Sequence, residues 1–299
     1  MTGNETAPIY NNRNLSVDAV KNKFSKIQIL SISCYRTSLA ILIFSNTCIL
    51  NSKPKLGDAD FPNPSPNTRH EEKVLEVKNG NFDLVLLGDS ITQSIGELGG
   101  KYSVFKSIWD KYYRPLNSIN LGYNGYRTEQ ILWNLENGEL NFKKSPKVVM
   151  LLIGTNNSDE RNFKTVHTAE EIYLGTKAIV DLIRNKCPKT KVLVLRIFPR
   201  GGDNEMGISA PTFKSSRKCI DICKQAGLLT KKLADGKRVF WMDINNIFLL
   251  ENGKINTRYM WDLLHPSPEG AEAWAKTVRS TLVRLINNQP VPKVQIIEK

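Results

Sequence analysis

The chain has 299 residues, of which 40% are hydrophobic and 24% are charged, and these values exclude wholesale disorder. The formal net charge of +13 permits a polyanionic partner, but the basic residues are scattered and form no stripe with interleaved aromatics. Nucleic-acid binding is therefore not expected. The five cysteines, an odd number without a CxxC pair, imply neither a disulfide framework nor a zinc site, and Cys219 and Cys223 fit buried positions one helical turn apart.

The first fifty residues differ from the rest of the chain. Several basic residues up to Arg36 precede an uncharged stretch, residues 37–52, with LAILIF at its centre. This stretch is too short to span a bilayer comfortably and is typical of the apolar region of a secretory signal. We therefore expect residues 1–50 to be a targeting segment and the protein to be exported or membrane-associated.

Two features of this segment speak for a different interpretation. The part before the apolar stretch is unusually long, and no A-x-A cleavage site follows it. The residues before Cys48 also lack the pattern of a lipidated cysteine. A disordered or mis-started N-terminus, with a cytoplasmic location, is therefore the alternative.

Residues 51–69 contain four prolines among polar residues and predict a semi-extended linker. The folded domain is expected to cover residues 70–289, and residues 290–299 form a C-terminal tail. His70 then lies at the end of the linker region.

After the linker, apolar runs alternate with segments of helical period. The predicted strands are residues 83–88, 118–122, 148–153, 192–198 and 238–243. The predicted helices are residues 127–137, 169–186, 214–233 and 269–287. Most of the strands are continuously apolar, as expected of parallel strands that are covered on both faces. The pattern predicts an α/β protein with a central parallel sheet and helices on both sides.

Polar segments follow four of the predicted strands. They are Gly-Asp-Ser at 88–90, Gly-Tyr-Asn-Gly at 122–125, Gly-Thr-Asn-Asn at 154–157 and Pro-Arg-Gly-Gly at 199–202. Ligands of such folds bind beyond the carboxyl ends of the strands, so we expect these segments to cluster in space.

Ser90 stands between a predicted buried strand and a helix, which is typical of an exposed nucleophile as well as of a turn. A serine nucleophile needs a base, and only three histidines are present. His265 lies in the last loop before the final helix, three residues after Asp262, so one loop could place the carboxylate beside the imidazole. His167 precedes a helix whose expected cap is Thr168.

Acyl transfer also needs donors for the developing oxyanion. The amide of Ser90, the backbone at Gly125 and the side chain of Asn156 are candidates, because all three follow predicted strands. Each alone is more often a turn residue, but together they fill the roles that acyl transfer requires.

Four ordered blocks now carry a resemblance. They are GDSIT, NLGYNG with ILWNLENGEL, LLIGTNN and WDLLHPSPEG. With these blocks the chain resembles the SGNH (GDSL-type) hydrolases, and it is most similar to the catalytic subunits of intracellular platelet-activating-factor acetylhydrolase. The match runs from about Arg69 to Leu285. It implies the three-layer, flavodoxin-like α/β/α sandwich of that superfamily.

The resemblance also implies roles for matching positions. It makes Ser90 the nucleophile, His265 the base and Asp262 its orienting partner, with the oxyanion hole formed by Ser90, Gly125 and Asn156. By the same resemblance Ile91, Thr155 and Leu264 are expected to wall the acyl side of the nucleophile and to favour acetyl groups. The alternative is that they are ordinary core residues and that the acyl group points into solvent. The family works without a metal or organic cofactor, and its homodimers imply a homodimer here.

Ile91 stands where the family name has leucine, and Asn157 where the wider superfamily has aspartate. The N-terminal segment has no counterpart in the intracellular subunits, so their location does not carry over, and membrane association through that segment is expected.

The leading hypothesis is a serine esterase that hydrolyses short-chain, acetyl-type esters of a small molecule or lipid through a covalent acyl-enzyme. A carbohydrate or peptidoglycan O-acetylesterase on the same fold is an alternative that the sequence does not separate from it. A catalytically silent binding protein is the alternative from another class, although the chain keeps all the residues that such a protein is free to lose.

Overall fold

The computed structural model describes residues 68–96, 100–202 and 214–292. The expected targeting segment, residues 1–50, and nearly all of the expected linker lie outside these ranges. Within the described residues, no helix is long and apolar enough to cross a membrane.

Five parallel strands form one sheet in the order β2-β1-β3-β4-β5. They are β1 (Leu84–Gly88), β2 (Ser118–Gly122), β3 (Val148–Leu152), β4 (Lys191–Leu195) and β5 (Val239–Met242). All five predicted strands are confirmed, with ends that differ by up to three residues. The strand order reverses at β1, because β2 lies on one side of it and β3 on the other.

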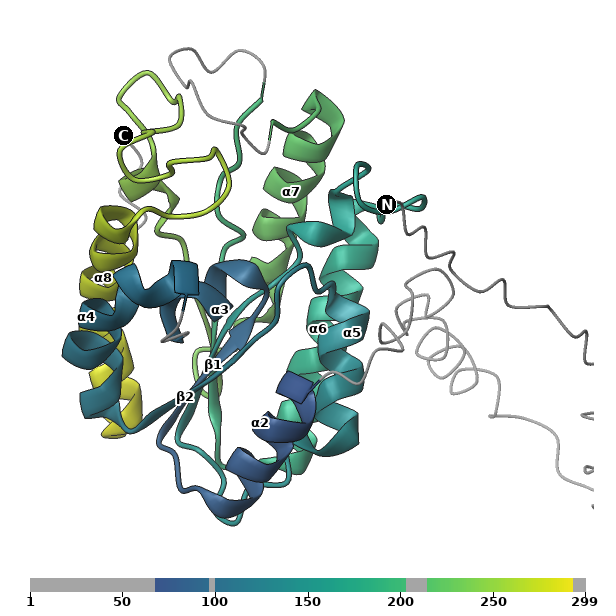
Figure 1. Ribbon diagram of the computed structural model, residues 1–299. Coiled ribbons are helices and arrows are strands. Elements are labelled where there is room, and N and C mark those ends of the chain that lie inside the picture. Colours follow the sequence, from purple (N-terminus) through teal and green to yellow (C-terminus); the bar gives the residue numbers. More distant parts are fainter. Residues whose placement is uncertain (1–67, 97–99, 203–213, 293–299) are drawn as a thin grey trace, which may run out of the picture. The chain divides into compact units, whose positions relative to one another are not determined.

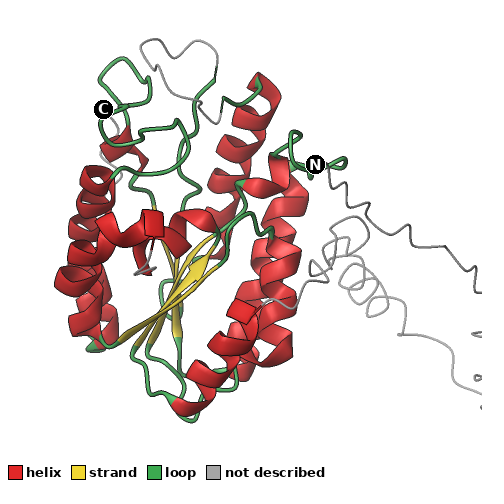
Figure 2. Ribbon diagram, in the orientation of Figure 1, coloured by secondary structure: helices red, strands yellow, loops and turns green. Residues whose placement is uncertain are grey.

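The helices cover both faces of the sheet, as Figures 1 and 2 show. They are α2 (Thr68–Asn79), α3 (Ser90–Gly96), α4 (Lys106–Ile108), α5 (Thr128–Asn134), α6 (Ala169–Lys186), α7 (Arg217–Leu229) and α8 (Pro268–Ile286). Short 3-10 or π-helical turns complete the chain: η2 (Gly100–Phe105), η3 (Trp109–Tyr113), η4 (Arg114–Leu116), η5 (Leu135–Glu139), η6 (Asn156–Ser158), η7 (Thr230–Leu233) and η8 (Asn245–Phe248). The predicted α/β/α sandwich is confirmed.

Alternate residues of β1 enter two different hydrophobic cores. Leu84 and Leu86 pack with α3, α4 and α8 on one face, whereas Val85 and Leu87 pack with α2, α5 and α6 on the other. This alternation follows from the pleat of a strand, which points successive side chains to opposite faces. It explains why β1 is apolar at every position up to Gly88.

The start of the domain differs from the prediction. Residues 68–79 form helix α2, so the last two residues of the expected linker, and His70 after them, are helical. His70 Nδ1 lies 2.8 Å from Glu139 Oε1, and the Arg69 guanidinium donates to the carbonyl of Gly122 at 2.9 Å. The sequence signal was missed because α2 is mostly polar and is held by these long-range polar contacts, with Val77 as its only fully buried side chain.

The longer helices begin at capping residues that are visible in the sequence. The side chain of Thr168 accepts from the amide of Glu171 at the start of α6, so the expected cap is confirmed. At the start of α8, Ser267 accepts from the amide of Gly270, and Pro268 occupies the first helical position. This cap fixes where the loop that carries His265 ends.

Candidate active site

The loop before α8 brings Asp262 and His265 to Ser90 at the carboxyl edge of the sheet. Ser90 Oγ lies 2.9 Å from His265 Nε2, and His265 Nδ1 lies 2.7 Å from Asp262 Oδ2. The structure therefore places the three side chains that the sequence singled out in one chain of hydrogen bonds. In such an arrangement the imidazole can accept the serine proton while the carboxylate stabilises the imidazolium.

Ser90 is positioned by the tight junction between β1 and α3. Gly88 is the last residue of β1, and a Cβ at this position would lie 2.2 Å from the carbonyl oxygen of Leu152 on β3. Only glycine therefore lets the two strands approach at this point. Ser90 then begins α3, so its hydroxyl stands at the N-terminal end of a helix, where negative charge is favoured.

The Asp262 carboxylate organises its own loop. Its Oδ1 accepts from the amides of Leu264, at 3.0 Å, and His265, at 2.6 Å, while Oδ2 faces the imidazole. Leu263, which lies between Asp262 and Leu264, has a left-handed backbone with φ of 69°. Its carbonyl accepts a hydrogen bond from the amide of Gly201 after β4. A buried leucine in this conformation is strained, so the packing around the loop has to hold it there.

The pKa of Asp262 reflects two opposing influences. Burial raises it, but the hydrogen bond and charge of His265 and the two amides together lower it below its usual value. The carboxylate is therefore ionised at neutral pH, as an orienting partner of an imidazolium requires.

A cavity of about 580 Å³, which we call the Ser90 cavity, opens in front of these side chains. Its lining includes Ser90, His265, Gly125 and Asn156. Asn156 Nδ2 donates to the carbonyl of Tyr126 at 2.9 Å, which fixes the amide and leaves a second proton on the same nitrogen. The expected oxyanion residues are thus brought together with the serine at one cavity.

Gly125 has a φ of 76°, and a Cβ there would meet no atom within 4 Å. The glycine is therefore needed for the left-handed backbone of this loop and not for space.

A buried polar cluster ties the loop after β3 to the start of α5. Asn157, which directly follows Asn156, accepts from the amide of Thr128 through Oδ1 and contacts Thr128 Oγ1, Glu129 and His167 through Nδ2. His167 also contacts Arg127, whose Nε lies 2.8 Å from Glu129 Oε1. His167 is therefore buried within this cluster next to the loop.

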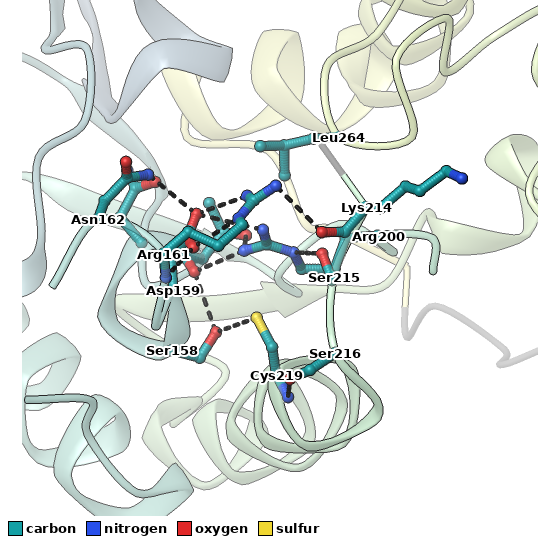
Figure 3. Close-up of polar contacts among 12 residues, drawn as sticks. Ser158, Asp159, Arg161, Asn162, Arg200, Lys214, Ser215, Ser216, Cys219 and Leu264 are labelled. Carbon is teal, nitrogen blue, oxygen red and sulfur yellow. Dashed lines mark hydrogen bonds and ion pairs between the residues drawn. The ribbon is translucent and has the colours of Figure 1, made fainter. Parts of the chain in front are cut away.

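A second polar cluster holds the same loop from the other side, and the sequence analysis did not identify it (Figure 3). Arg200 donates to the carbonyl of Thr155 at 2.9 Å and to the hydroxyl of Ser215 at 2.6 Å. Its guanidinium and that of Arg161 converge on the carboxylate of Asp159. Although burial opposes ionisation, the two cations lower the pKa of Asp159 to about 2. Pro-Arg-Gly-Gly after β4 was the signal that could have indicated Arg200.

Asp89 is a further residue that sequence reasoning left without a role. Its side chain is fully buried directly before the serine, where Oδ1 accepts from the amide of Ile91 at 3.0 Å. Burial raises the pKa of this carboxyl to about 7, against the lowering effect of the Ile91 amide and of the charges on His265 and Arg200. Part of the population is therefore protonated at neutral pH.

The expected acyl wall of Ile91, Thr155 and Leu264 needs correction. Leu264 lines the Ser90 cavity, but Ile91 and Thr155 do not. Ile91 points into the core between the sheet and α8, and the Thr155 hydroxyl lies 3.2 Å from an Arg200 nitrogen, behind the cavity. The reason is helical geometry, because the residue after the first residue of α3 faces the sheet and not the cavity.

No group of three or more histidine, cysteine or acidic side chains in the described ranges is placed to hold a metal ion. Cys187, Cys219 and Cys223 are free and buried, and the last two lie one turn apart on α7, as expected.

The fold and the residues at this edge of the sheet are those expected of an acyl hydrolase. The sequence model of the GDSL-like lipase/acylhydrolase family matches residues 86–273, and the chain belongs to that family. It is a carboxylic ester hydrolase.

Among its relatives is the platelet-activating factor acetylhydrolase IB subunit alpha1 of Bos taurus, which is 31% identical over 73% of this chain and 82% of its own length. The alpha2 subunit of Rattus norvegicus is 31% identical over 76% of this chain and 87% of its own length. A solved GDSL-like lipase from Bacteroides thetaiotaomicron superposes with a TM-score of 0.55 at 16% identity, covering 73% of this chain and 97% of that one. That structure shares the fold.

Proposed function

We propose that the protein hydrolyses short-chain esters, acetyl esters above all, through a covalent acyl-enzyme on Ser90. The observation that carries this proposal is the hydrogen-bonded chain from Ser90 through His265 to Asp262 at a cavity that also presents Asn156 and Gly125. The names of the 31% identical relatives support an acetyl group as the one transferred.

The proposed reaction begins when Ser90 Oγ attacks the ester carbonyl carbon and His265 Nε2 takes the hydroxyl proton. Asn156 Nδ2 and the amides of Ser90 and Gly125 stabilise the oxyanion of the tetrahedral intermediate. The imidazolium then protonates the departing alcohol, which leaves the acyl group on Ser90. Water, deprotonated by the same imidazole, hydrolyses this acyl-enzyme and restores the serine.

The proposal is tested with an organophosphonate probe that phosphonylates activated serines. We expect stoichiometric labelling of the peptide that contains Ser90, and loss of p-nitrophenyl acetate hydrolysis in proportion to the label. Denatured protein is the control. It should not be labelled, because the serine is activated only in the folded protein. Labelling at another serine, or full labelling of Ser90 with activity retained, contradicts the proposal.

One observation favours a second candidate, a carbohydrate O-acetylesterase. Trp261, next to Asp262, is 45% exposed at the Ser90 cavity and packs edge-to-face with Phe105 at a centroid distance of 6.1 Å. Tyr102 and Phe163 also line this cavity. Exposed aromatic faces at a cavity offer apolar stacking surface for a sugar ring while one edge stays wet.

The two candidates are separated by their acyl acceptors. Hydrolysis of acetylated xylo-oligosaccharides is compared with hydrolysis of a 2-acetyl glycerophosphocholine lipid, with ethyl acetate as the small reference ester. If the substrate is a carbohydrate, Trp261→Ala raises KM for the acetylated sugar and leaves the ethyl acetate kinetics nearly unchanged. An equal loss on all three esters speaks against a stacking role.

A further inference from the structure

A second cavity of about 500 Å³ lies beyond the carboxyl ends of β4 and β5. We call it the β4–α7 cavity, because its walls are residues 196–200 after β4, one side of α7, and residues after β5 that include Asn245. Among the described residues, the two cavities share no lining residue. Its charged lining is mainly cationic and consists of Arg196, Arg200, Arg217 and Lys224 against Asp221.

Two residues that line this cavity each carry a buried polar atom without a hydrogen-bond partner among the described residues. Asn245 is 7% exposed and donates through Nδ2 to the carbonyl of Ile197, but its Oδ1 has no hydrogen-bond partner in the part of the chain that the structure describes. The same holds for the buried Nε of Arg196 among the described residues. Each unpartnered buried group costs roughly 1 to 3 kcal/mol.

One side chain connects this cavity to the oxyanion loop, residues 154–158. Cys223 lines the β4–α7 cavity, and its Sγ lies 3.0 Å from Ser158 Oγ and 3.8 Å from the carbonyl oxygen of Thr155. Cys219, one turn earlier on α7, lies 3.2 Å from the same serine hydroxyl (Figure 3). The Cys223 thiol therefore stands between the cavity and the backbone that carries Asn156.

The surroundings of Cys223 also favour its reactive form. A hydrogen bond from Cys219 and the positive charge of Arg200 lower the pKa of the Cys223 thiol, although burial opposes them. In Cys187, which lines neither cavity, burial raises the pKa. Because the thiolate is the nucleophile, Cys223 is the buried cysteine best prepared to react with a molecule in the cavity.

We propose that Cys223 is a thiol-modification site at which low-molecular-weight disulfides and thiosulfonates, entering the β4–α7 cavity, form a mixed disulfide. The Cys223 thiolate attacks one sulfur of the reagent, a new S–S bond forms, and the other half leaves as a thiolate or a sulfinate. The sulfur–sulfur bond of the reagent is the oxidant, so the reaction needs no other.

The modification affects the Ser90 site through packing. The Cys223 sulfur already touches Ser158 and Thr155, so an added group displaces the oxyanion loop or the face of α7 that supports it. Asn156 then loses its alignment with the oxyanion, which lowers kcat more than it raises KM. This effect on activity rests on the proposed function, whereas the modification itself does not.

The test uses methyl methanethiosulfonate on the full chain, with p-nitrophenyl acetate hydrolysis and peptide mass spectrometry followed in parallel. We expect a methylthio group on Cys223, a fall in kcat of at least about tenfold with KM changed less than about twofold, and recovery on adding dithiothreitol. Fragmentation of the tryptic peptide CIDICK distinguishes Cys223 from Cys219.

Matched variants locate the effect. Cys223→Ser should resist inhibition relative to its own starting activity, and Cys187→Ser should be inhibited like the unmodified sequence. Absence of the methylthio group from Cys223 overturns the proposal. Inhibition of Cys223→Ser with the original time course, or full modification of Cys223 without loss of rate, overturns the effect on the Ser90 site.

If Cys223→Ser does not fold, the chain without substitutions is used instead. The fraction of Cys223 that is labelled is then plotted against the remaining activity, which shows whether the loss of activity follows modification of Cys223. Labelling of Cys223 in the Ser90→Ala protein tests the modification without relying on esterase activity, and its absence there contradicts the proposal.

Discussion

The Ser90 cavity and the β4–α7 cavity open at the same edge of one sheet, yet they differ in how their polar groups are satisfied. In the first, Ser90, His265 and Asp262 bond to one another, and Asn156 is fixed by Tyr126. In the second, Asn245 Oδ1 lacks a partner among the described residues. A parallel sheet gathers its loops at one edge, but Ser90 and His265 meet beside β1, where the strand order reverses.

The comparison also shows what the two cavities share. The oxyanion loop separates them, and Arg200 and Cys223 contact it from the side of the β4–α7 cavity. Changes on either side of the loop should therefore reach the reaction, with effects that decrease with distance from the reacting atoms.

The largest expected effect is loss of the nucleophile or the base. Ser90→Ala and His265→Ala should each lower kcat for p-nitrophenyl acetate by roughly four or more orders of magnitude, and Asp262→Asn should cost less. Ser94→Ala is the matched control, because Ser94 lines the same cavity but donates to the carbonyl of Ile91. A folded Ser90→Ala protein with near-normal activity would falsify the serine mechanism.

Loss of the oxyanion amide should come next. Asn156→Ala is expected to lower kcat about 10²- to 10³-fold with little change in KM, because the amide acts on charge that develops only in the transition state. Asn124→Ala, at another residue of the same cavity, should have a much smaller effect. A change confined to KM would show that Asn156 binds the ground state instead.

The chain-length preference tests the corrected acyl wall. The rate kcat/KM should fall from acetate to octanoate by roughly ten- to a hundredfold, because Leu264 lines the cavity and overfilling costs about 1 to 3 kcal/mol. Leu264→Ala should flatten this profile, and Ile91→Val should not, since Ile91 faces the core. A profile that is flat in the unmodified sequence would contradict the wall.

A smaller effect is expected at Arg200, which acts through the loop. Arg200→Lys should lower kcat about tenfold and leave KM unchanged, because one ammonium group cannot replace the fork that holds Thr155, Ser215 and Asp159 together. Arg196→Lys is the control, since Arg196 lines the same cavity as Arg200 but pairs with Asp243 after β5. If kcat falls equally in both variants, the loss is due to general destabilisation of the protein.

The smallest effect concerns the pH dependence of stability. The folded protein keeps the Asp89 proton up to about pH 7, whereas the unfolded chain releases it near pH 4, so this residue lowers the free energy of unfolding as pH rises between those values. The difference in unfolding free energy between the unmodified sequence and Asp89→Asn should fall by up to about 1.4 kcal/mol per pH unit over this range.

Urea denaturation at several pH values between 5 and 8 measures this difference, which should level off above about pH 7. Asp159→Asn is the control of opposite sign. The pKa of Asp159 is lowered, so its contribution is lost only as pH falls through the acid range, and its difference should stay constant from pH 5 to 8. A constant difference for Asp89→Asn as well would refute the raised pKa.

The sequence by itself determined the sheet, the long helices and the residues that meet at Ser90. Continuous apolar runs indicated the strands, and the cap Thr168 marked where α6 begins. Residues after parallel strands must lie at one edge, so their types alone indicated the site.

Only the tertiary structure decided which way Ile91 points and that residues 68–79 form a helix. It also decided that Arg200, Cys223 and Asp89 lie close to the site. These properties depend on contacts between residues far apart in the chain, such as Arg69 with Gly122 and Arg200 with Thr155. Local patterns cannot encode such contacts, because the burial and charge that fix them exist only after the layers have packed.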